Sequence, residues 1–426
     1  MDIKAVILAA GKGTRMKSET TPKVLHQIMG KTLLGYVMDN VKSFVSEQFV
    51  IVGHHADEVE KFVKENYSNA KTVLQTPQFG TGHAVSMVCP ELENYDGLIL
   101  ILCGDTPLVK EETLKAFVDY HKSSNSDITV MSTIFDNPTN YGRIIRENDN
   151  SLKCIVEEKD ATSEQKAVKE VNAGIYCLDW KKVKDAFSQL KSNNAQGEYY
   201  LTDIISWGKD NKLNVNAYIL QNSDEIYGIN SRQNLATATK MMNRRNLEKY
   251  MTEGVTIVDP DSTWISEDTQ IGQDTIIYPS TYIEGKNIIG KNCKIGPMAH
   301  LRGGVEVGDN VKLGNFVEVK KSKISSNTNV GHLSYIGDSE LGSRVNIGAG
   351  TITANYNALT KEKSKTVLKD DVKIGSNTVL VAPVTVNNGA NVGAGSVITK
   401  DIPSWALAIT RSPLKVLADW VARKNK

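Results

Sequence analysis

Aliphatic residues recur at every sixth position through the C-terminal part of the chain. The spacing begins at Ile265 and holds for ten consecutive repeats, slips by one residue before Ile324 and again before Leu341, and returns after an interruption at Leu368. Glycine often follows the aliphatic residue. The repeat positions are Ile265, Ile271, Ile277, Ile283, Ile289, Ile295, Leu301, Val307, Leu313, Val319, Ile324, Val330, Ile336, Leu341, Ile347, Leu368, Ile374, Leu380, Val386, Val392 and Ile398. A six-residue repeat is typical of a parallel β-helix, in which the aliphatic side chains point inward and stack from coil to coil.

The repeat also gives the approximate size of this β-helix. Three six-residue units form one triangular coil in the hexapeptide transferases that the pattern resembles, and their β-helix is left-handed. The 21 repeats then predict about seven coils, and a strand spacing of roughly 4.8 Å makes the prism about 30 Å long. The interruption from Thr353 to Val367 predicts a loop that leaves the prism. Because the repeat indicates shape and not chemistry, a purely structural prism stays open at this point.

The N-terminal part has a different pattern, in which short apolar runs alternate with helical periodicity. The predicted strands are Ile3–Ala10, Phe49–Val52, Lys71–Leu74 and Leu98–Leu102, and the predicted helices are Ala56–Asn66 and one that starts in His83–Val88. This alternation predicts an α/β domain with a doubly wound, Rossmann-like sheet, whose ligands bind at the carboxyl ends of the strands.

Two further helices are predicted outside these repeats. Residues 231–253 contain neither Gly nor Pro and are rich in helix formers, so they predict one long linker helix. Ser231 can cap this helix and Gly254 can end it. Residues 414–423 predict a short amphipathic tail helix that packs on the protein.

Charge and composition exclude several classes of function. Fifty basic and 49 acidic residues nearly cancel, which argues against nucleic-acid binding. Apolar runs such as Leu98–Cys103 are too short to span a membrane. The start Met1-Asp2 leads straight into a strand, so we expect no secretory signal and a cytoplasmic location. Five cysteines without a Cys-x-x-Cys pair predict reduced thiols and no zinc site.

A glycine-rich turn follows the first predicted strand. Residues 9–16 read Ala-Ala-Gly-Lys-Gly-Thr-Arg-Met, and Pro22-Lys23 follow. Such a turn lets phosphates approach the backbone N–H groups, and Lys12, Arg15 and Lys23 add positive charge. The spacing is not that of a Walker A loop.

Two other strand ends carry candidate site residues. Gln75 precedes a Gly-Thr-Gly-His loop over Gly80–His83. Asp105 ends the apolar strand at Leu98–Leu102, where a carboxylate can hold Mg²⁺, which takes hard oxygen ligands and bridges phosphates. The alternative for Asp105 is a helix cap, and we interpret His83 as a structural residue at a helix start.

The glycine-rich run followed by Pro-Lys resembles the signature of the sugar-1-phosphate nucleotidyltransferases. Tyr141–Arg143, Val156–Lys159, Val171–Gly174 and Gly228–Asn230 follow in the order and spacing of one family. Over almost the whole chain, the sequence resembles the bacterial bifunctional N-acetylglucosamine-1-phosphate uridyltransferase/glucosamine-1-phosphate acetyltransferases, which make a cell-wall precursor. The resemblance implies a uridyltransferase domain over residues 1–230, the linker over 231–253 and an acetyltransferase β-helix domain over 254–426.

The resemblance assigns roles to residues of the first domain. Asp105 and Asn230 would ligate Mg²⁺, and Arg15 and Lys23 would face the triphosphate of UTP. The residues that would hold the uridine nucleotide and the N-acetylglucosamine moiety are Leu8, Ala10, Gly11, Lys23, Gln75, Gly80, Thr81, Gly142, Glu157, Asn172 and Asn230. The implied reaction joins two anions, so metal and cations must neutralise charge and no nucleophilic side chain is needed.

The β-helix carries polar residues that its repeat does not require. By the resemblance, His332 is the general base of acetyl transfer, and Glu318 could orient it. The predicted contacts of glucosamine-1-phosphate are Arg302, Lys320, Tyr335 and Asn346. The predicted contacts of acetyl-CoA are Ala349, Asn355, Tyr356, Ser376, Ala394 and Arg411. Asn355 could also donate to the developing oxyanion. The resemblance further implies a homotrimer.

The chain departs from the family at several points. The β-helix is expected to be shorter, with turns missing before Arg302. The loop after Tyr356 lacks the usual Asp-Gly and is lengthened, which leaves open whether Lys361 or Lys363 faces CoA. Cys103 replaces the more usual aromatic residue before Gly104-Asp105.

Two other interpretations stay open. One is a single-activity sugar-1-phosphate nucleotidyltransferase whose β-helix is structural or regulatory. The other is a non-catalytic regulatory subunit. Arg302 and His332 argue against the first because a scaffold does not need them, and Arg15, Lys23 and Asp105 argue against the second.

Overall fold

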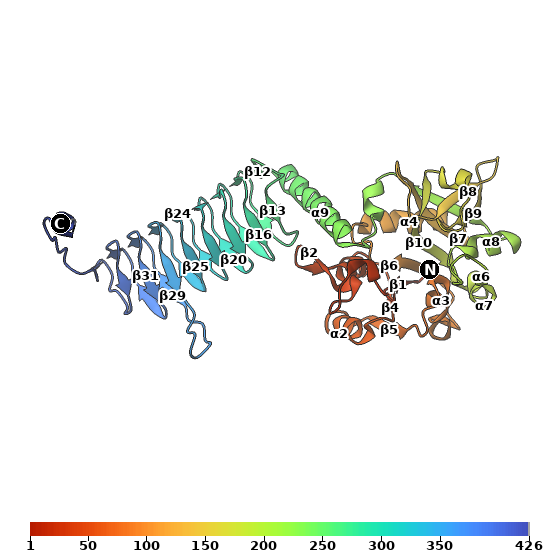
Figure 1. Ribbon diagram of the computed structural model, residues 1–426, viewed down its shortest axis with the longest axis horizontal. Coiled ribbons are helices and arrows are strands. Elements are labelled where there is room, and N and C mark those ends of the chain that lie inside the picture. The colour runs from red at the N-terminus through yellow and green to blue at the C-terminus, as the bar shows by residue number, and fades with distance from the viewer. Residues whose placement is uncertain (425–426) are drawn as a thin grey trace. The chain divides into compact units, whose positions relative to one another are not determined.

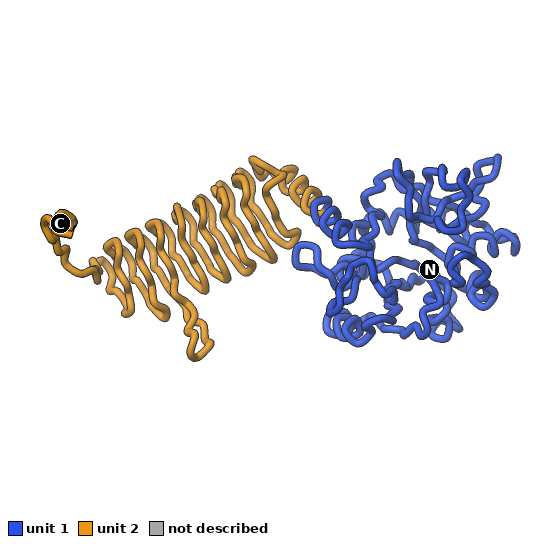
Figure 2. The backbone as a smooth tube through the Cα atoms, viewed as in Figure 1, with its two compact units in different colours: residues 1–241 blue, residues 242–426 orange. Residues whose placement is uncertain are grey.

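The computed structural model describes residues 1–424 as two compact units. Residues 1–241 form the first unit and the chain from residue 242 onward forms the second (Figure 2). The boundary falls inside one long helix, α9 (Arg232–Thr252). Each unit has its own hydrophobic core.

The first unit is built on a mixed, nine-stranded sheet. Its main path runs β11-β7-β10-β6-β1-β4-β5, and the hairpin β8–β9 extends it from β10. All neighbours on the main path are parallel except β10, which is antiparallel to both β6 and β7. The strands are β1 (Ile3–Leu8), β4 (Glu47–Val52), β5 (Ala70–Leu74), β6 (Leu98–Cys103), β7 (Ile128–Ile134), β8 (Arg143–Arg146), β9 (Leu152–Val156), β10 (Glu170–Asp179) and β11 (Val215–Leu220).

Helices cover both faces of this sheet, as the doubly wound prediction requires (Figure 1). Ile7 packs in one core with α1, α2 and α4, whereas its neighbour Val6 packs in the other core with α3, α6, α7 and α8. The helices are α1 (Leu33–Asp39), α2 (Ala56–Asn66), α3 (Thr81–Ser86), α4 (Glu111–Ser123), α5 (Ser163–Lys166), α6 (Trp180–Val183), α7 (Ala186–Gln189) and α8 (Asp203–Asp210). The short elements are β2 (Gln27–Ile28), β3 (Lys31–Thr32), η1 (Thr14–Met16), η2 (Lys23–Leu25), η3 (Cys89–Leu92) and η4 (Ser223–Ile226). Successive side chains of a strand such as β1 thus enter the two different cores, one on each face of the sheet.

The predicted linker helix is present as α9. Ser231 Oγ accepts a hydrogen bond from the backbone N–H of Asn234, at 3.2 Å, which is the geometry of an N-cap. Gly254 follows the helix with a φ of 94°, a left-handed conformation that a side chain would resist. The helix near His83 begins two residues earlier than its predicted start, at Thr81.

The second unit is a triangular prism of short parallel strands, a left-handed β-helix (Figure 1). The first stack holds β12 (Thr256–Ile257), β15 (Ile276–Ile277), β18 (Lys294–Ile295), β21 (Lys312–Asn315), β24 (Asn329–His332), β27 (Asn346–Ile347), β30 (Lys373–Ile374), β33 (Asn391–Val392) and β35 (Leu407–Ala408). The second holds β13 (Trp264–Ile265), β16 (Tyr282–Glu284), β19 (His300–Arg302), β22 (Glu318–Lys320), β25 (Tyr335–Gly337), β28 (Ile352–Ala354), β31 (Val379–Val381) and β34 (Val397–Ile398). The third holds β14 (Gln270–Ile271), β17 (Asn287–Ile289), β20 (Val305–Val307), β23 (Lys323–Ile324), β26 (Ser339–Leu341), β29 (Thr366–Leu368) and β32 (Val384–Val386).

The stacks of nine, eight and seven strands make about eight coils, one more than the repeat predicted. Three strands account for the difference: β12 and β35 at the ends, and β28 at the start of the predicted loop, pair in register but lack the aliphatic-glycine pattern. Nearly all of the repeat residues are buried and line one continuous core, and Ile271, at the first turns, is only partly buried against it. The predicted loop lies between β28 and β29 and projects from the prism (Figure 1).

The tail differs from its prediction. Only Trp420–Lys424 forms a helix, α10, and Leu414, Val416 and Trp420 are exposed. Its apolar residues have nothing to pack on among the described residues of the chain, so the amphipathic pattern does not produce a longer, packed helix. Across residues 1–424, none of the helices combines the length and apolarity needed to cross a membrane.

Candidate functional site

The glycine-rich turn after β1 opens directly onto a pocket. Gly13 has a φ of 59°, and a Cβ there would lie 2.8 Å from the Cβ of Lys23. Glycine is therefore required here for two reasons: the backbone is left-handed, and η2 approaches too closely to leave room for a side chain. This packing holds Lys23 beside the turn, as the sequence predicted for a phosphate-binding loop.

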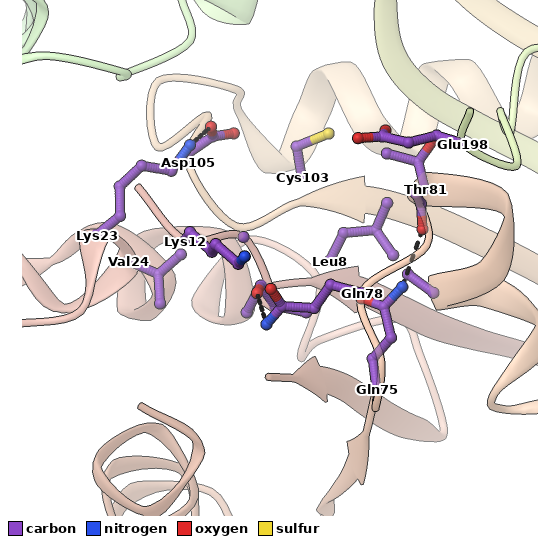
Figure 3. Close-up of a pocket in the computed structure, with 15 residues that line it drawn as sticks. Leu8, Lys12, Lys23, Val24, Gln75, Gln78, Thr81, Cys103, Asp105 and Glu198 are labelled. Carbon is purple, nitrogen blue, oxygen red and sulfur yellow. Dashed lines mark hydrogen bonds and ion pairs between the residues drawn. The ribbon is translucent and has the colours of Figure 1, made fainter. Parts of the chain in front are cut away.

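The pocket has a volume of about 450 Å³ and lies at the carboxyl ends of β1 and β6. Figure 3 shows Lys23 and Asp105 at one end of it, and Thr81 and Glu198 at the other. Its lining residues are Leu8, Ala9, Ala10, Gly11, Lys12, Lys23, Val24, Gln75, Gln78, Gly80, Thr81, Ala84, Cys103, Asp105 and Glu198. The lining includes all seven residues that the resemblance assigns to the uridine nucleotide, namely Leu8, Ala10, Gly11, Lys23, Gln75, Gly80 and Thr81.

Two oxygen atoms meet one cation at the charged end of the pocket. Lys23 Nζ forms an ion pair with Asp105 Oδ2 and donates to Asn230 Oδ1 at 3.1 Å. Arg15 Nη2 also donates to Asn230 Oδ1, at 2.9 Å. A carboxylate oxygen and an amide oxygen that converge on one positive centre are the hard donors that a divalent cation takes.

The oxygen donors of Asp105 and Asn230 fit a metal ion that takes most of its ligands from the substrate phosphates and water. Among residues 1–424, no group of three or more His, Cys, Asp or Glu side chains could hold a metal. Mg²⁺ commonly binds through one or two protein oxygens, with phosphates and water completing its shell. Asp105 and Asn230 therefore match a shared site for metal and triphosphate, and Lys23 and Arg15 supply positive charge there.

Gln75 is fixed at the opposite end of the pocket. It follows β5, is only 4% exposed, and its Nε2 donates to Gly80 O at 2.9 Å and contacts His83 Nδ1 at 3.1 Å. Gly80 has a φ of 108°, and a Cβ there would lie 2.7 Å from Tyr199 O. His83 is thus occupied in holding Gln75, which agrees with its structural interpretation.

The three predicted sugar contacts lie together beside the pocket but do not line it. Asn172 N–H donates to Gly142 O at 2.9 Å, and a Cβ on Gly142 would lie 3.4 Å from the carboxylate oxygens of Glu157. Thr202 Oγ1 donates to Glu157 at 3.3 Å. Burial, together with the nearby charges of Asp160, Asp203 and Glu198, raises the pKa of Glu157.

Cys103 takes part in the pocket as a neutral wall. Its Sγ lies 3.5 Å from Gly174 O. Burial and the neighbouring carboxylate of Asp105 raise the pKa of the thiol to about 12. At neutral pH the thiol is protonated and is therefore a weak nucleophile.

Several lining residues were not singled out from the sequence. Gln78 Nε2 donates to Ala10 O at 2.9 Å and so braces the phosphate loop. Glu198 reaches the pocket because the next residue, Tyr199, pairs with the backbone of Phe79 and Gly82. These are contacts between distant segments, and no local motif indicates them. The remaining lining residues, Val24 and Ala84, are apolar and carry no chemical signal.

The second group of candidate residues lies on the prism. Arg302 Nη1 donates to Glu318 Oε1 at 3.0 Å. The positive charges of Lys363 and Arg302 lower the pKa of Lys320. Three cations from two strands and the loop therefore meet in one place, which suits an anionic phosphate. Of the two loop lysines left open by the sequence, Lys363 is the one that lies against Lys320.

The predicted base and three predicted CoA contacts occupy one corner of successive coils. His332, Ala349, Ser376 and Ala394 each stand two residues after an inward repeat residue, and the coils are paired in register. Asn377 N–H donates to Ala349 O at 2.7 Å, and Gly395 N–H donates to Ser376 O at 2.8 Å. Arg411 Nη1 donates to Ala394 O at 3.0 Å, so it joins the same column.

Tyr335 and Asn355 meet over Gly337. A Cβ on Gly337 would lie 2.3 Å from the Tyr335 hydroxyl and 2.8 Å from Asn355 Nδ2. Asn355 Nδ2 donates to Asp338 Oδ2 at 2.5 Å, and the side chain is buried. Tyr356 is exposed, and its backbone pairs with Lys363 across the loop.

Two residues of the prism have other partners than the sequence predicted. Glu318, expected beside His332, is hydrogen-bonded to Arg302, and the side chain at His332 Nδ1 is Asn315, at 2.5 Å. Glu318 lies on the next face of the prism, because β22 belongs to the second stack and β24, which carries His332, to the first. Asn346 contacts Asn329 at 3.1 Å, at the opposite end of β24 from His332.

Comparison with known proteins agrees with this division. The nucleotidyl transferase family matches residues 4–240, and the bacterial transferase hexapeptide family matches residues 288–321 and 365–400. The "Bifunctional protein GlmU" of Alkaliphilus metalliredigens is 44% identical, with 100% of this chain and 99% of the relative covered. This chain belongs to the GlmU family. The GlmU proteins of Clostridioides difficile and Caldanaerobacter subterraneus are 44% and 43% identical to this chain, and each alignment again covers 100% of this chain and 99% of the relative.

The family also provides a measure of length. The alignment with the Alkaliphilus metalliredigens protein spans 459 residues, 33 more than the 426 of this chain. A coil such as that from Ile277 to Ile295 contains 18 residues, so the difference approaches two coils. Membership in this family of nucleotidyltransferases implies a divalent metal and small-molecule substrates.

Proposed function

We propose that the chain makes UDP-N-acetylglucosamine from glucosamine-1-phosphate in two steps, acetyl transfer on the prism and uridylyl transfer in the first unit. The observation that carries the proposal is that each unit gathers its own set of charged and polar groups. Asp105, Asn230 and Lys23 converge in one unit, and Lys320, Lys363 and Arg302 in the other. A prism that served only as a scaffold would not need the second set.

Uridylyl transfer requires the site to neutralise the charges of two phosphate substrates and to align them for attack. An oxygen of the N-acetylglucosamine-1-phosphate phosphate attacks the α-phosphorus of UTP and forms a new P–O bond. The bond between the α-phosphorus and the oxygen that bridges it to the β-phosphate breaks, and pyrophosphate leaves with that oxygen and its electron pair. Lys23 and Arg15 bind the phosphates, and Gly142, Glu157 and Asn172 orient the sugar. Mg²⁺, held by Asp105 and Asn230, supplies a positive charge on the phosphate oxygens when bound. No side chain needs to form a covalent intermediate.

Acetyl transfer requires a neutral amine. The glucosamine nitrogen attacks the thioester carbonyl of acetyl-CoA, an N–C bond forms, the C–S bond breaks, and the sulfur leaves as thiolate. His332 takes the proton from the nitrogen and returns one to the sulfur, so that the products are the amide and the free thiol. Arg302, Lys320 and Tyr335 hold the sugar phosphate, and Asn355 donates to the oxyanion.

The assembly and location of the enzyme belong to the same proposal. The loop that carries Tyr356 projects from the prism, as it would to reach a neighbouring subunit. We place the enzyme in the cytoplasm as a homotrimer, which sedimentation would detect as about three times the 46.8 kDa chain mass. A monomer with full acetyl-transfer activity would contradict the shared site.

One assay tests both activities. Purified protein receives glucosamine-1-phosphate, acetyl-CoA, UTP and Mg²⁺, and free thiol and pyrophosphate are followed separately. Asp105→Ala should abolish pyrophosphate release and leave thiol release unchanged, whereas His332→Ala should lower thiol release by roughly 10²–10⁴-fold. Chelation of the metal should act like Asp105→Ala. Pyrophosphate release from N-acetylglucosamine-1-phosphate without any thiol release would establish the single-activity alternative.

A further inference from the structure

A hydrogen bond between two neighbouring coils holds the imidazole of His332. Asn315 ends β21, His332 ends β24, and the two residues are partners in the register of these parallel strands. Nδ1 of His332 lies 2.5 Å from Oδ1 of Asn315. We propose that Asn315 is the positioning residue of the acetyl-transfer base, which fixes the ring with Nδ1 protonated and Nε2 free to take the proton. This inference rests on the proposed role of His332.

The tautomer follows from the chemistry of the two partners. A neutral imidazole has one N–H donor and one acceptor nitrogen, and an amide oxygen can only accept. With Oδ1 of Asn315 against Nδ1, the hydrogen must be on Nδ1 and the lone pair on Nε2. Without this bond the ring could rotate and exchange tautomers, and only part of the molecules would present a base to the amine.

The prism is locally modified to make this contact. β21 and β24 have four residues each, whereas the other strands of their stack have two. A Cβ on Gly314 would lie 1.9 Å from Gly331 O, so the two backbones approach closely just before the pair. The pair is held on its other side as well, because Leu333 N–H donates to Asn315 O at 3.0 Å. Ser334 Oγ donates to His332 O at 2.8 Å.

The partner is a neutral amide and not a carboxylate, which makes the inference testable. In the coils that carry Asn315 and His332, the charged or titratable groups on the strands of the adjacent face are Glu318 and Lys320 on β22 and Tyr335 on β25. Glu318 accepts from Arg302. A carboxylate placed at position 315 would keep the hydrogen bond and would favour the protonated ring, so that the base would lose its proton only at higher pH.

The test compares two substitutions of Asn315 in the full-length protein. Asn315→Leu removes the acceptor and should lower kcat for acetyl transfer by about 10–100-fold, with little change in KM for glucosamine-1-phosphate. Asn315→Asp should retain more activity than Asn315→Leu and move the acidic limb of the pH–rate profile upward by about one unit. Asn391→Leu, an exposed amide on β33 of the same stack, is the matched control and should behave as wild type.

The outcomes separate this inference from the proposed function. Wild-type acetyl transfer in Asn315→Leu, alongside a large loss in His332→Ala, would overturn the positioning role and leave the base in place. An unchanged rate in His332→Ala would instead overturn the proposed function. A pH profile of Asn315→Asp identical to that of the wild type would also contradict the contact, whatever its rate. Thermal unfolding of each variant, followed by circular dichroism, reports whether the prism is folded, because uridylyl transfer belongs to the other unit.

Discussion

The ammonium groups of Lys320 and Lys363 lie close enough that the charge of Lys363 lowers the pKa of Lys320. Lys320 belongs to a strand of the prism and Lys363 to the loop that leaves it. Like charges held together repel each other until an anion lies between them, and a phosphate relieves this repulsion with charge-assisted hydrogen bonds. The arrangement therefore suits an anionic group such as a phosphate.

Removal of Lys363 should weaken phosphate recognition. Lys363→Ala should raise KM for glucosamine-1-phosphate in acetyl transfer by roughly 10-fold or more, since a hydrogen bond to a charged group contributes about 1.5–3 kcal/mol. The neighbouring Lys361→Ala is the matched control, because only Lys363 contacts Lys320. Steady-state kinetics at several salt concentrations would check the result. Equal effects of the two substitutions would show that general loop charge, and not this contact, holds the phosphate.

The ionised Glu157 carboxylate should lower the stability of the folded protein while it contributes to sugar binding. Its pKa is raised chiefly by burial, so at neutral pH the folded protein carries a carboxylate that would be better solvated in the unfolded chain. Glu157→Gln removes this charge and keeps an oxygen that can accept from Thr202. We expect a higher thermal midpoint at pH 7, together with a higher KM for N-acetylglucosamine-1-phosphate in uridylyl transfer.

The pH dependence of this effect has a definite sign. Because the carboxyl is harder to ionise in the folded state, its destabilising effect is complete above the folded pKa and fades as pH falls from there toward the unfolded pKa. The gain from Glu157→Gln should therefore shrink toward pH 4 in thermal scans. Glu164→Gln, on the exposed face of α5, is the control and should leave both the midpoint and KM unchanged. A destabilised Glu157→Gln protein would contradict this account.

His121 should make the first unit sensitive to acid. Burial lowers its pKa to about 4, although Asp179 and Asp127 oppose the shift and Lys122 and Lys182 add to it. Between pH 6.5 and 4 the unfolded state binds a proton that the folded state refuses, so stability falls as pH falls through this window. The loss from pH 6.5 to 5 should be about 2 kcal/mol in urea unfolding.

One substitution separates the effect of His121 on acid stability from the effect of the carboxylates. His121→Gln cannot titrate, and it can still hydrogen-bond to Thr129, which lies 2.7 Å from His121 Nδ1. Its stability should fall less between pH 6.5 and 5 than that of the wild type, by roughly the same 2 kcal/mol. Parallel pH curves for the two proteins would assign the acid sensitivity to other groups.

The two glycines that precede the Asn315–His332 pair should differ sharply in their tolerance of a side chain. A Cβ on Gly314 would collide with Gly331 O, whereas a Cβ on Gly331 would meet nothing closer than 3.9 Å. Gly314→Ala should destabilise the prism by roughly 1–3 kcal/mol and lower acetyl transfer, because the coils must separate. Gly331→Ala should be mild in both respects. Thermal scans and the thiol assay would check both variants.

Much of the fold could be predicted because its signals are local and periodic. The six-residue repeat gives the stacked strands, and the predicted strands Ile3–Ala10 and Leu98–Leu102 correspond to β1 and β6, whose carboxyl ends line the pocket. Helix α2 begins and ends at its predicted residues, Ala56 and Asn66. The pattern misses the ends of the prism, where β12 and β35 pair through the backbone without the repeat.

The site was only partly predictable because several of its contacts join distant segments. Glu198 lines the pocket through backbone pairing of Tyr199 with Phe79, and this pairing has no sequence signal. Asn315 is an ordinary polar residue until the coil register places it beside His332. The prediction of a packed tail helix was wrong because amphipathic periodicity identifies an apolar helix face but does not show that another part of the protein packs against it.

The coil register sets rules for how the length of this protein can change. Each strand of the prism pairs only with the same stack in the coils before and after it. Whole coils can therefore be gained or lost between Ile265 and Ile295 while every later side chain keeps its face, as in other repeat proteins. Between Leu313 and Ile347 the pairing steps are 17 residues long, and there a single inserted residue would turn His332 away from Asn315. Evolution can thus treat the first coils as an adjustable spacer, whereas the coils around His332 form a fixed frame.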